Sequence, residues 1–104
     1  MNKLTKEHLR LMRDEEGNHR IMLMQNTTGN YLHTDLKMPV NDALLVRELL
    51  LDQEFTSQDV SLKEDDGYYR IILKVKNVND EEIIFHGRKL NLNDAVYEID
   101  ELIS

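Results

Sequence analysis

The chain has 104 residues, and its 40% hydrophobic and 32% charged side chains exclude an intrinsically disordered protein. The absence of cysteine excludes disulfide frameworks, thiolate metal sites and thiol nucleophiles. Thirteen Lys and Arg against twenty Asp and Glu give a net charge of −7, which opposes non-specific binding to phosphate backbones and anionic lipid. We expect a single domain spanning residues 1–104.

The N-terminal segment is polar at first and then becomes amphipathic. Residues 1–8 contain no apolar stretch of signal-peptide length, so we expect a cytoplasmic protein that does not cross a membrane. Thr5 precedes residues 6–13, which are mostly good helix formers, and Thr is a common N-cap. This segment predicts a helix, whereas its counterpart at residues 56–63 alternates apolar and polar side chains like a strand.

The two halves of the chain resemble each other. Residues 13–23 (RDEEGNHRIML) parallel residues 63–73 (KEDDGYYRIIL), and MPVNDAL at 38–44 parallels LNLNDAV at 90–96. This self-similarity predicts an internal duplication of residues 5–51 and 55–103. The alternative is that two unrelated hairpin-helix segments use the same turn and capping residues.

Each half is expected to form a β-hairpin followed by a helix. Residues 69–76 alternate with a period of two, and residues 82–86 supply a partner strand. Apolar residues between 92 and 103 follow the i, i+3, i+4 and i+7 spacing of a helix. Asn93 and its counterpart Asn41 are the predicted N-caps. The predicted fold is α+β, with two tandem hairpin-helix units of the ββα type, an antiparallel sheet and an N-terminal helix.

The first of the two closing helices is apolar almost all round. Only Arg47 and Glu48 interrupt its aliphatic residues, which are Ala43, Leu44, Leu45, Val46, Leu49, Leu50 and Leu51. A helix of this kind is usually buried, and we expect burial at the centre of the domain rather than coverage by a partner.

Several strand residues have a binding interpretation as well as a structural one. Met22 and Met24 alternate with the apolar residues beside them, and Met is common on adaptable binding surfaces, but we expect the N-terminal helix to cover them. Arg70, Lys74 and Lys76 share one predicted strand face, which we interpret as the solvent side of a hairpin.

Acidic clusters and histidines are the candidate metal ligands. The runs Asp14-Glu15-Glu16-Gly17 and Glu64-Asp65-Asp66-Gly67 lack the alternating ligand spacing of an EF-hand and are typical of hairpin turns whose glycine has positive φ. No two of the histidines at 8, 19, 33 and 86 have the i, i+4 spacing of a zinc-binding helix. His33 and Asp35 would share a strand face, but two ligands do not make a site. We expect no metal and no cofactor.

The sequence contains no recognisable catalytic motif. It lacks a nucleophile elbow and a glycine-rich phosphate loop, so we expect no catalytic residues and no enzymatic activity. We expect instead a protein that binds another macromolecule, as an adaptor or as an inhibitor of the kind that bacterial phages and other mobile elements encode. The expected partner is a protein, direct nucleic-acid binding is not expected, and a homodimer is left open.

The candidate interaction surface is acidic and consists of Asp94, Glu98, Asp100, Glu101, Glu64, Asp65 and Asp66. One alternative is that these carboxylates mimic a phosphate backbone and block a DNA- or RNA-binding protein. The other alternative is a small-ligand or enzyme role, which a pocket with His33 or His86 beside carboxylates would favour.

Overall fold

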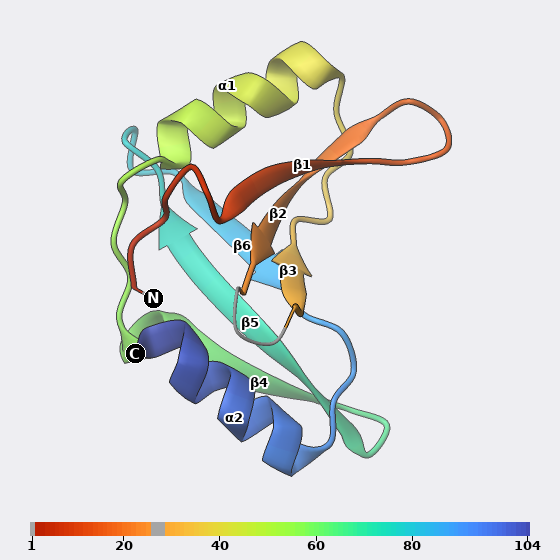
Figure 1. The fold of residues 1–104 in the computed structure, drawn as a ribbon, viewed down its shortest axis with the longest axis vertical. Coiled ribbons are helices and arrows are strands. Elements are labelled where there is room, and N and C mark those ends of the chain that lie inside the picture. The colour runs from red at the N-terminus through yellow and green to blue at the C-terminus, as the bar shows by residue number, and fades with distance from the viewer. Residues whose placement is uncertain (1, 26–28) are drawn as a thin grey trace.

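The structure is a computed structural model that describes residues 2–25 and 29–104. These residues form a six-stranded antiparallel sheet and two α-helices (Figure 1). In chain order the elements are β1 (Leu9–Arg13), β2 (His19–Met24), β3 (Tyr31–His33), α1 (Val40–Leu50), a short 3-10 helix η1 (Ser57–Asp59), β4 (Val60–Asp65), β5 (Tyr68–Lys76), β6 (Glu82–His86) and α2 (Leu92–Ile103). In this described part of the chain, no helix is long and apolar enough to cross a membrane.

Each half of the chain contributes three strands and then a helix. The sheet order is β1-β2-β3-β6-β5-β4, so the first strand of each half lies at an edge and the third strands are central. The halves meet where His33 of β3 pairs with His86 of β6. The α+β class is therefore confirmed. The tandem ββα units are not confirmed, because a third strand in each half is needed to join the halves into one sheet.

Equivalent backbone hydrogen bonds recur in the two halves. His19 and Met38 exchange two bonds with N–O distances of 2.7 and 2.9 Å, and Tyr69 and Leu90 exchange two of 2.7 and 2.8 Å. Each of these pairs ties the segment that precedes a helix to the second strand of its own half. The two helices are thereby placed in equivalent positions relative to their strands.

The predicted N-terminal helix is wrong. Residues 6–8 form a single turn, with the backbone N–H of Leu9 donating to the Thr5 carbonyl, and β1 begins directly after it. Leu9 and Leu11 alternate with polar or half-exposed residues and pair with Leu23 and Ile21 of β2. Pairing with a distant strand therefore overrides the local helix propensity of this segment.

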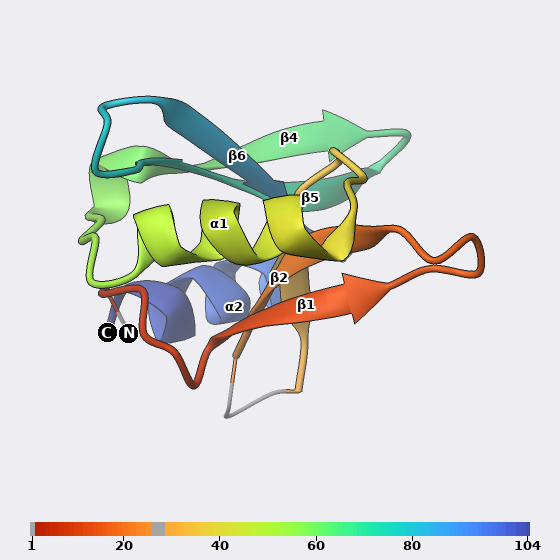
Figure 2. The same ribbon diagram turned by 90° about the horizontal axis from the view of Figure 1, so that it is seen from above.

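The core lies between one face of the sheet and the two helices. Its fully buried side chains include Leu9, Ile21, Leu23, Leu73 and Phe85 from strands, and Ala43, Leu50, Ala95 and Leu102 from helices. In Figure 2 the edge strands β1 and β4 lie on opposite sides of α1, so the sheet curves around the helices. One face of the sheet is thus covered by both helices.

Helix α1 is not buried all round, contrary to the expectation. Ala43 and Leu50 are buried, but Leu44 is 42% exposed and Leu45 is 60% exposed. The α2 residues that align with Leu44 and Leu45 are Val96 and Tyr97, which are 46% and 52% exposed. Both helices therefore present an apolar outer stripe at equivalent positions, because each helix contacts the sheet along one side only.

The capping residues also differ from the prediction. The side chain of Asn91 accepts a hydrogen bond from the backbone N–H of Asp94 at 2.8 Å, so Asn91 is the N-cap of α2, and Asn93 lies within the helix. Pro39 occupies the N-cap position of α1 and makes no side-chain capping bond, and Asn41 is likewise inside its helix. Each helix begins about two residues earlier than the sequence pattern indicates.

The turn prediction is confirmed at both acidic clusters. Gly17 and Gly67 have φ values of 85° and 82°, in the left-handed region that favours glycine. They close the β1–β2 and β4–β5 hairpins, and each is preceded by the consecutive acids described above.

Candidate functional site: the open face of the sheet

The face of the sheet opposite the helices carries the most distinctive set of side chains. Successive strand residues point to opposite faces, so the residues that alternate with the core residues project from this side. One row crosses all six strands through the pairs Arg10–Met22, Met22–His33, His33–His86, His86–Ile72 and Ile72–Ser61. None of these described side chains belongs to the core cluster between the sheet and the helices, although Ile72 is itself buried, with 8% exposure. We call this surface the open face.

The open face combines an apolar middle with cationic flanks. Its apolar side chains are Met12, Met22, Met24, Ile72 and Ile84, its rings are Tyr31, His33, Tyr68 and His86, and its cations are Arg10, Arg20, Lys63, Arg70, Lys74 and Lys76. Asp65 and Glu82 are the acidic residues at these strand positions. In a chain of net charge −7, this surface therefore has the opposite sign to the molecule as a whole.

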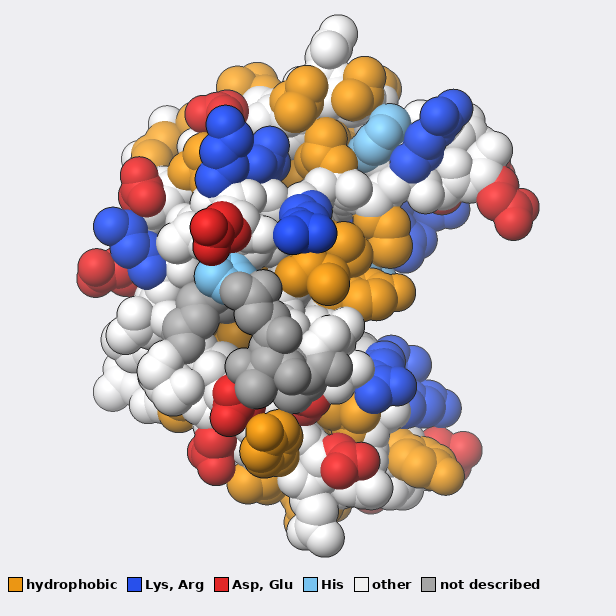
Figure 3. Space-filling model, in the orientation of Figure 1, with side chains coloured by type: hydrophobic (Ala, Val, Ile, Leu, Met, Phe, Trp, Pro, Cys, Tyr) orange, Lys and Arg blue, Asp and Glu red, His pale blue; other side chains and the backbone are white. Residues whose placement is uncertain are grey.

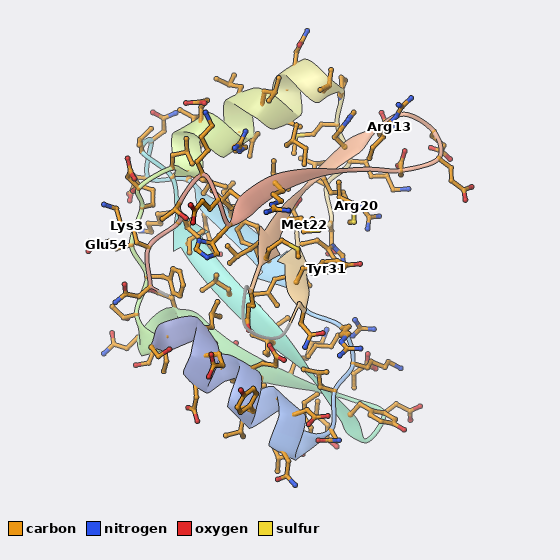
Figure 4. The ribbon with its side chains drawn as sticks, viewed as in Figure 1. Lys3, Arg13, Arg20, Met22, Tyr31 and Glu54 are labelled. Carbon is orange, nitrogen blue, oxygen red and sulfur yellow. The ribbon has the colours of Figure 1, made fainter. Side chains whose placement is uncertain are left out.

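The expected cover over the methionines does not exist. Met22 and Met24 are half-buried and lie on the open face, because the segment predicted to cover them forms β1 instead. In Figure 4, Met22 lies close to Arg20 and Tyr31, whereas Lys3 and Glu54 lie on the other side of the molecule. Figure 3 shows a hollow between the β1–β2 hairpin and the β4–β5 hairpin, with Lys and Arg side chains at its edges.

Two aspartates at the hairpin ends bind cations next to the open face. Asp14 lies 3.5 Å from the Nζ atom of Lys37, and Asp65 lies 3.0 Å from the Nε atom of Arg70 and 3.9 Å from the Nζ atom of Lys89. The hydrogen bond from Arg70 is the largest of the effects that lower the pKa of Asp65, and Lys89 adds to it. Asp65 therefore stays ionised and orients Arg70.

The pKa of Asp14 is lowered as well, although for a different balance of reasons. Desolvation of the carboxylate raises the pKa, but hydrogen bonds from the backbone N–H groups of Asn18 and Glu16, together with Lys37, outweigh it. The same carboxylate closes the β1–β2 turn. Asp14 is therefore a structural residue of the hairpin.

Two pockets flank the seam between β3 and β6. One has a volume of about 360 Å³ and is mostly apolar; it is lined by Thr34, Asp35, Leu36, Met38, Val46, Glu82, Ile83, Ile84 and His86. The Nε2 atom of His86 lies 3.1 Å from Asp35 in this pocket. His86 therefore does stand beside carboxylates, although the pocket is open to solvent, and Asp35 faces His86 rather than His33.

The second pocket also has a volume of about 360 Å³, and its lining has the opposite charge. It is lined by Gly29, Asn30, Tyr31, His33, Arg70 and Arg88. We call it the arginine pocket. No group of three or more His, Asp and Glu side chains in the described ranges is placed to hold a metal ion.

The structure places the acidic residues singled out from the sequence on helix α2 and around the β4–β5 turn. Asp94 and Asp100 are exposed on α2 and Glu101 is partly exposed there, whereas Glu64 and Asp66 are exposed around the β4–β5 turn. Asp65 is half-exposed and engaged by Arg70. Glu98 was placed on this surface by its helical position, which is wrong, because only 4% of it is exposed.

Glu98 has a structural role instead. Its carboxylate accepts a hydrogen bond from the Asn30 amide, and its backbone carbonyl accepts one from the Gln25 amide at 3.4 Å. These contacts connect α2 to the segment that leads into β3. The helical pattern put Glu98 on a polar face, and only the three-dimensional arrangement shows that this face meets another part of the chain.

The chain matches no known family model, and no similar protein was found among characterised proteins or among solved structures. Its described residues define a two-layer α+β protein in which both helices lie on the same face of the sheet.

Proposed function

We propose that this protein acts by binding another protein, and that the open face of the sheet is its binding surface. The observation that carries the proposal is the sheet face opposite the helices, where the half-buried side chains of Met22, Met24 and Ile84 lie between flanks of Arg and Lys. Monomeric proteins rarely leave a contiguous apolar surface open, and such surfaces commonly mark interaction sites.

The composition of the open face favours a protein partner. Met, Tyr and Arg are enriched at protein–protein interfaces, and an apolar centre with a polar rim is the usual arrangement. Six strands at a spacing of about 4.8 Å make the face roughly 24 Å wide, comparable with an interface patch of about 800 Å² per partner. The face is therefore large enough for a standard interface.

The charge of the open face indicates an acidic partner. Arg10 and Arg20 lie on one flank and Lys63 and Lys74 on the other, so a partner with carboxylates around an apolar centre would complement both flanks. The acidic-surface alternative has less support, because Glu98 is buried and Asp65 is paired with Arg70. In this proposal the protein is an adaptor or an inhibitor without catalytic activity.

The test is affinity capture from a cell lysate with matched charge variants. The open-face variant carries Arg20→Glu and Lys74→Glu, and the control carries Lys3→Glu and Lys6→Glu, which change the net charge equally at exposed positions off the open face. A third variant, with Asp100→Lys and Glu101→Lys, tests the acidic surface. Nuclease treatment of the lysate separates a protein partner from one held through nucleic acid.

The proposal requires that a protein is captured even after nuclease treatment and that only the open-face variant fails to capture it. The purified partner should also shift amide signals of β2, β3, β5 and β6 in NMR spectra. Loss of the captured protein with the α2 variant would favour nucleic-acid mimicry instead. If nuclease treatment abolishes capture, the ligand is a nucleic acid and the proposed protein partner is overturned.

A further inference from the structure

We propose that the arginine pocket binds a nucleoside phosphate, with the phosphate at Arg70 and Arg88 and the ring of the ligand beside Tyr31. The pocket lies at one end of the β3–β6 seam and shares Tyr31, His33 and Arg70 with the open face, but the inference is argued from the pocket alone and does not rest on the proposed protein partner.

Arg70 and Arg88 are the cations of the pocket. Arg70 donates from Nε to Asp65 and from Nη1 to the Gly87 carbonyl, both at 3.0 Å, which orients the guanidinium and leaves the Nη2 edge for a ligand. Arg88 is exposed and has no ion pair among the described residues. Two guanidinium groups at one pocket favour an anion that accepts several hydrogen bonds, and phosphate is such an anion.

The lining contains no carboxylate that would repel an anion. Its other residues are Gly29, Asn30, Tyr31 and His33, and the Asn30 amide is turned towards Glu98. Asp65 neutralises one charge nearby, but Lys89 lies 3.9 Å from the same carboxylate. Glu98 adds a second negative charge behind Asn30, but Arg70, Arg88 and Lys89 still outnumber these two carboxylates.

The size and rings of the pocket indicate more than a bare phosphate. A volume of about 360 Å³ falls in the range of small-molecule sites and exceeds the needs of a phosphate ion. The rings of Tyr31 and His33 have centroids 6.2 Å apart and are tilted by 46°, and Tyr31 is 42% exposed. An exposed aromatic ring beside cations is the arrangement that stacks a nucleobase.

The other end of the seam provides an internal comparison. Continuing the register of the His33–His86 pair places Tyr31 in line with Arg88, and Ile84 in line with Asp35. The first of these pairs lines the arginine pocket, and the second lines the pocket that contains Glu82. Opposite charges therefore occupy equivalent positions, and of these two pockets it is the arginine pocket that combines cations with an exposed tyrosine ring.

The experiment is an NMR titration of the whole chain with each of the four nucleoside monophosphates, with adenosine, with inorganic phosphate and with ten-residue homo-oligonucleotides. Arg88→Ala is compared with Arg10→Ala, which removes the same charge from an exposed arginine elsewhere on the open face. Tyr31→Leu removes the ring and keeps an apolar side chain.

We expect saturable shifts at Gly29, Tyr31, His33 and Arg88 with at least one monophosphate. Arg88→Ala should weaken this binding about tenfold, the effect of losing a charge-assisted hydrogen bond, and Arg10→Ala should leave it within about twofold. Tyr31→Leu should weaken monophosphate binding without changing the weaker binding of inorganic phosphate. If an oligonucleotide binds the same residues more tightly than its monomer, the natural ligand is a nucleic-acid strand. If it binds equally or more weakly, the natural ligand is a free nucleotide.

Two results would overturn the inference. One is the absence of saturable shifts in the pocket with every nucleotide and oligonucleotide. The other is an equal loss of binding in Arg88→Ala and Arg10→Ala, since that would show general attraction to the cations of the open face.

Discussion

Glu98 connects helix α2 to the segment before β3 through its buried carboxylate. We predict that Glu98→Ala lowers the free energy of unfolding by about 1–3 kcal/mol, because the Asn30 amide loses a buried acceptor. Asp100→Ala, on the exposed side of the same helix, should stay within about 0.5 kcal/mol of the wild type. Urea denaturation measures both values, and equal effects of the two substitutions would contradict the structural role of Glu98.

Asp65 makes stability dependent on acid pH. Its pKa in the folded protein lies below the ordinary value of 3.8 because Arg70 donates to it, so its contribution to stability is present above that value and is lost as the pH falls through the folded pKa. Arg70→Ala should raise the pKa of Asp65 towards 3.8 and weaken the acid dependence of unfolding below about pH 4. Carboxyl-carbon NMR titration measures the pKa directly. An unchanged Asp65 titration in the variant would show that the Arg70 contact is absent in solution.

At the residue scale, the sequence predicts the features that depend only on neighbouring residues in the chain. The positive φ of Gly17 and Gly67 follows from the acidic runs that precede them, because turn chemistry is a property of a few adjacent residues. The burial of Glu98 could not be predicted in this way, since its partner Asn30 is 68 positions away. The arginine pocket was missed for the same reason, because it combines residues from β3, β5 and the loop after β6.

Helix α2 begins at a cap that the sequence pattern misplaced by two residues. Asn91→Ala should lower the free energy of unfolding by about 0.5–2 kcal/mol, because the backbone N–H of Asp94 loses its side-chain acceptor. Asn93→Ala is the matched control and should be close to neutral, since Asn93 is exposed inside the helix. Thermal unfolding of the two variants checks this, and a larger loss for Asn93→Ala would move the cap back to the position predicted from the sequence.

Helix α1 exposes its apolar outer side, although its sequence pattern predicts burial all round. Leu45→Gln should change stability by less than about 0.5 kcal/mol because the side chain is 60% exposed. Leu50→Ala should cost about 2–5 kcal/mol because Leu50 is fully buried. Chemical denaturation of both variants is the measurement. A loss of more than about 2 kcal/mol for Leu45→Gln would show that α1 is buried all round, as its composition indicates.

The sequence predicts correctly those elements whose own apolar periodicity distinguishes a helix from a strand, without any contribution from distant parts of the chain. Residues 69–76 and 92–103 fall within strand β5 and helix α2 because their apolar spacing fits one structure only. Residues 5–13 fail this criterion, because helix propensity and strand alternation compete there. Pairing of Leu9 with Leu23 and of Leu11 with Ile21 decides the outcome, and no local window contains that information.

At the scale of the whole molecule, the two halves form one sheet through the β3–β6 pair. The repeated order of three strands and a helix is compatible with the duplication of residues 5–51 and 55–103, which stays a prediction. The similarity of the halves indicates two comparable units, but it does not show that their third strands pair or that both helices pack on the same face. Those two features create the open face, which is why the sequence pointed to the acidic residues instead.

The central claim is that the open face is uncovered in the free protein and is covered by the partner. Methyl NMR of methionine tests it most directly, because Met12, Met22 and Met24 lie on the open face whereas Met38 is 7% exposed in the core. With a soluble paramagnetic relaxation agent, we expect the three open-face methyl signals to be attenuated and the Met38 signal to persist. Addition of the captured partner should protect Met22 and Met24. Protection of these methyls in the free protein, or continued attenuation in the complex, would contradict the claim.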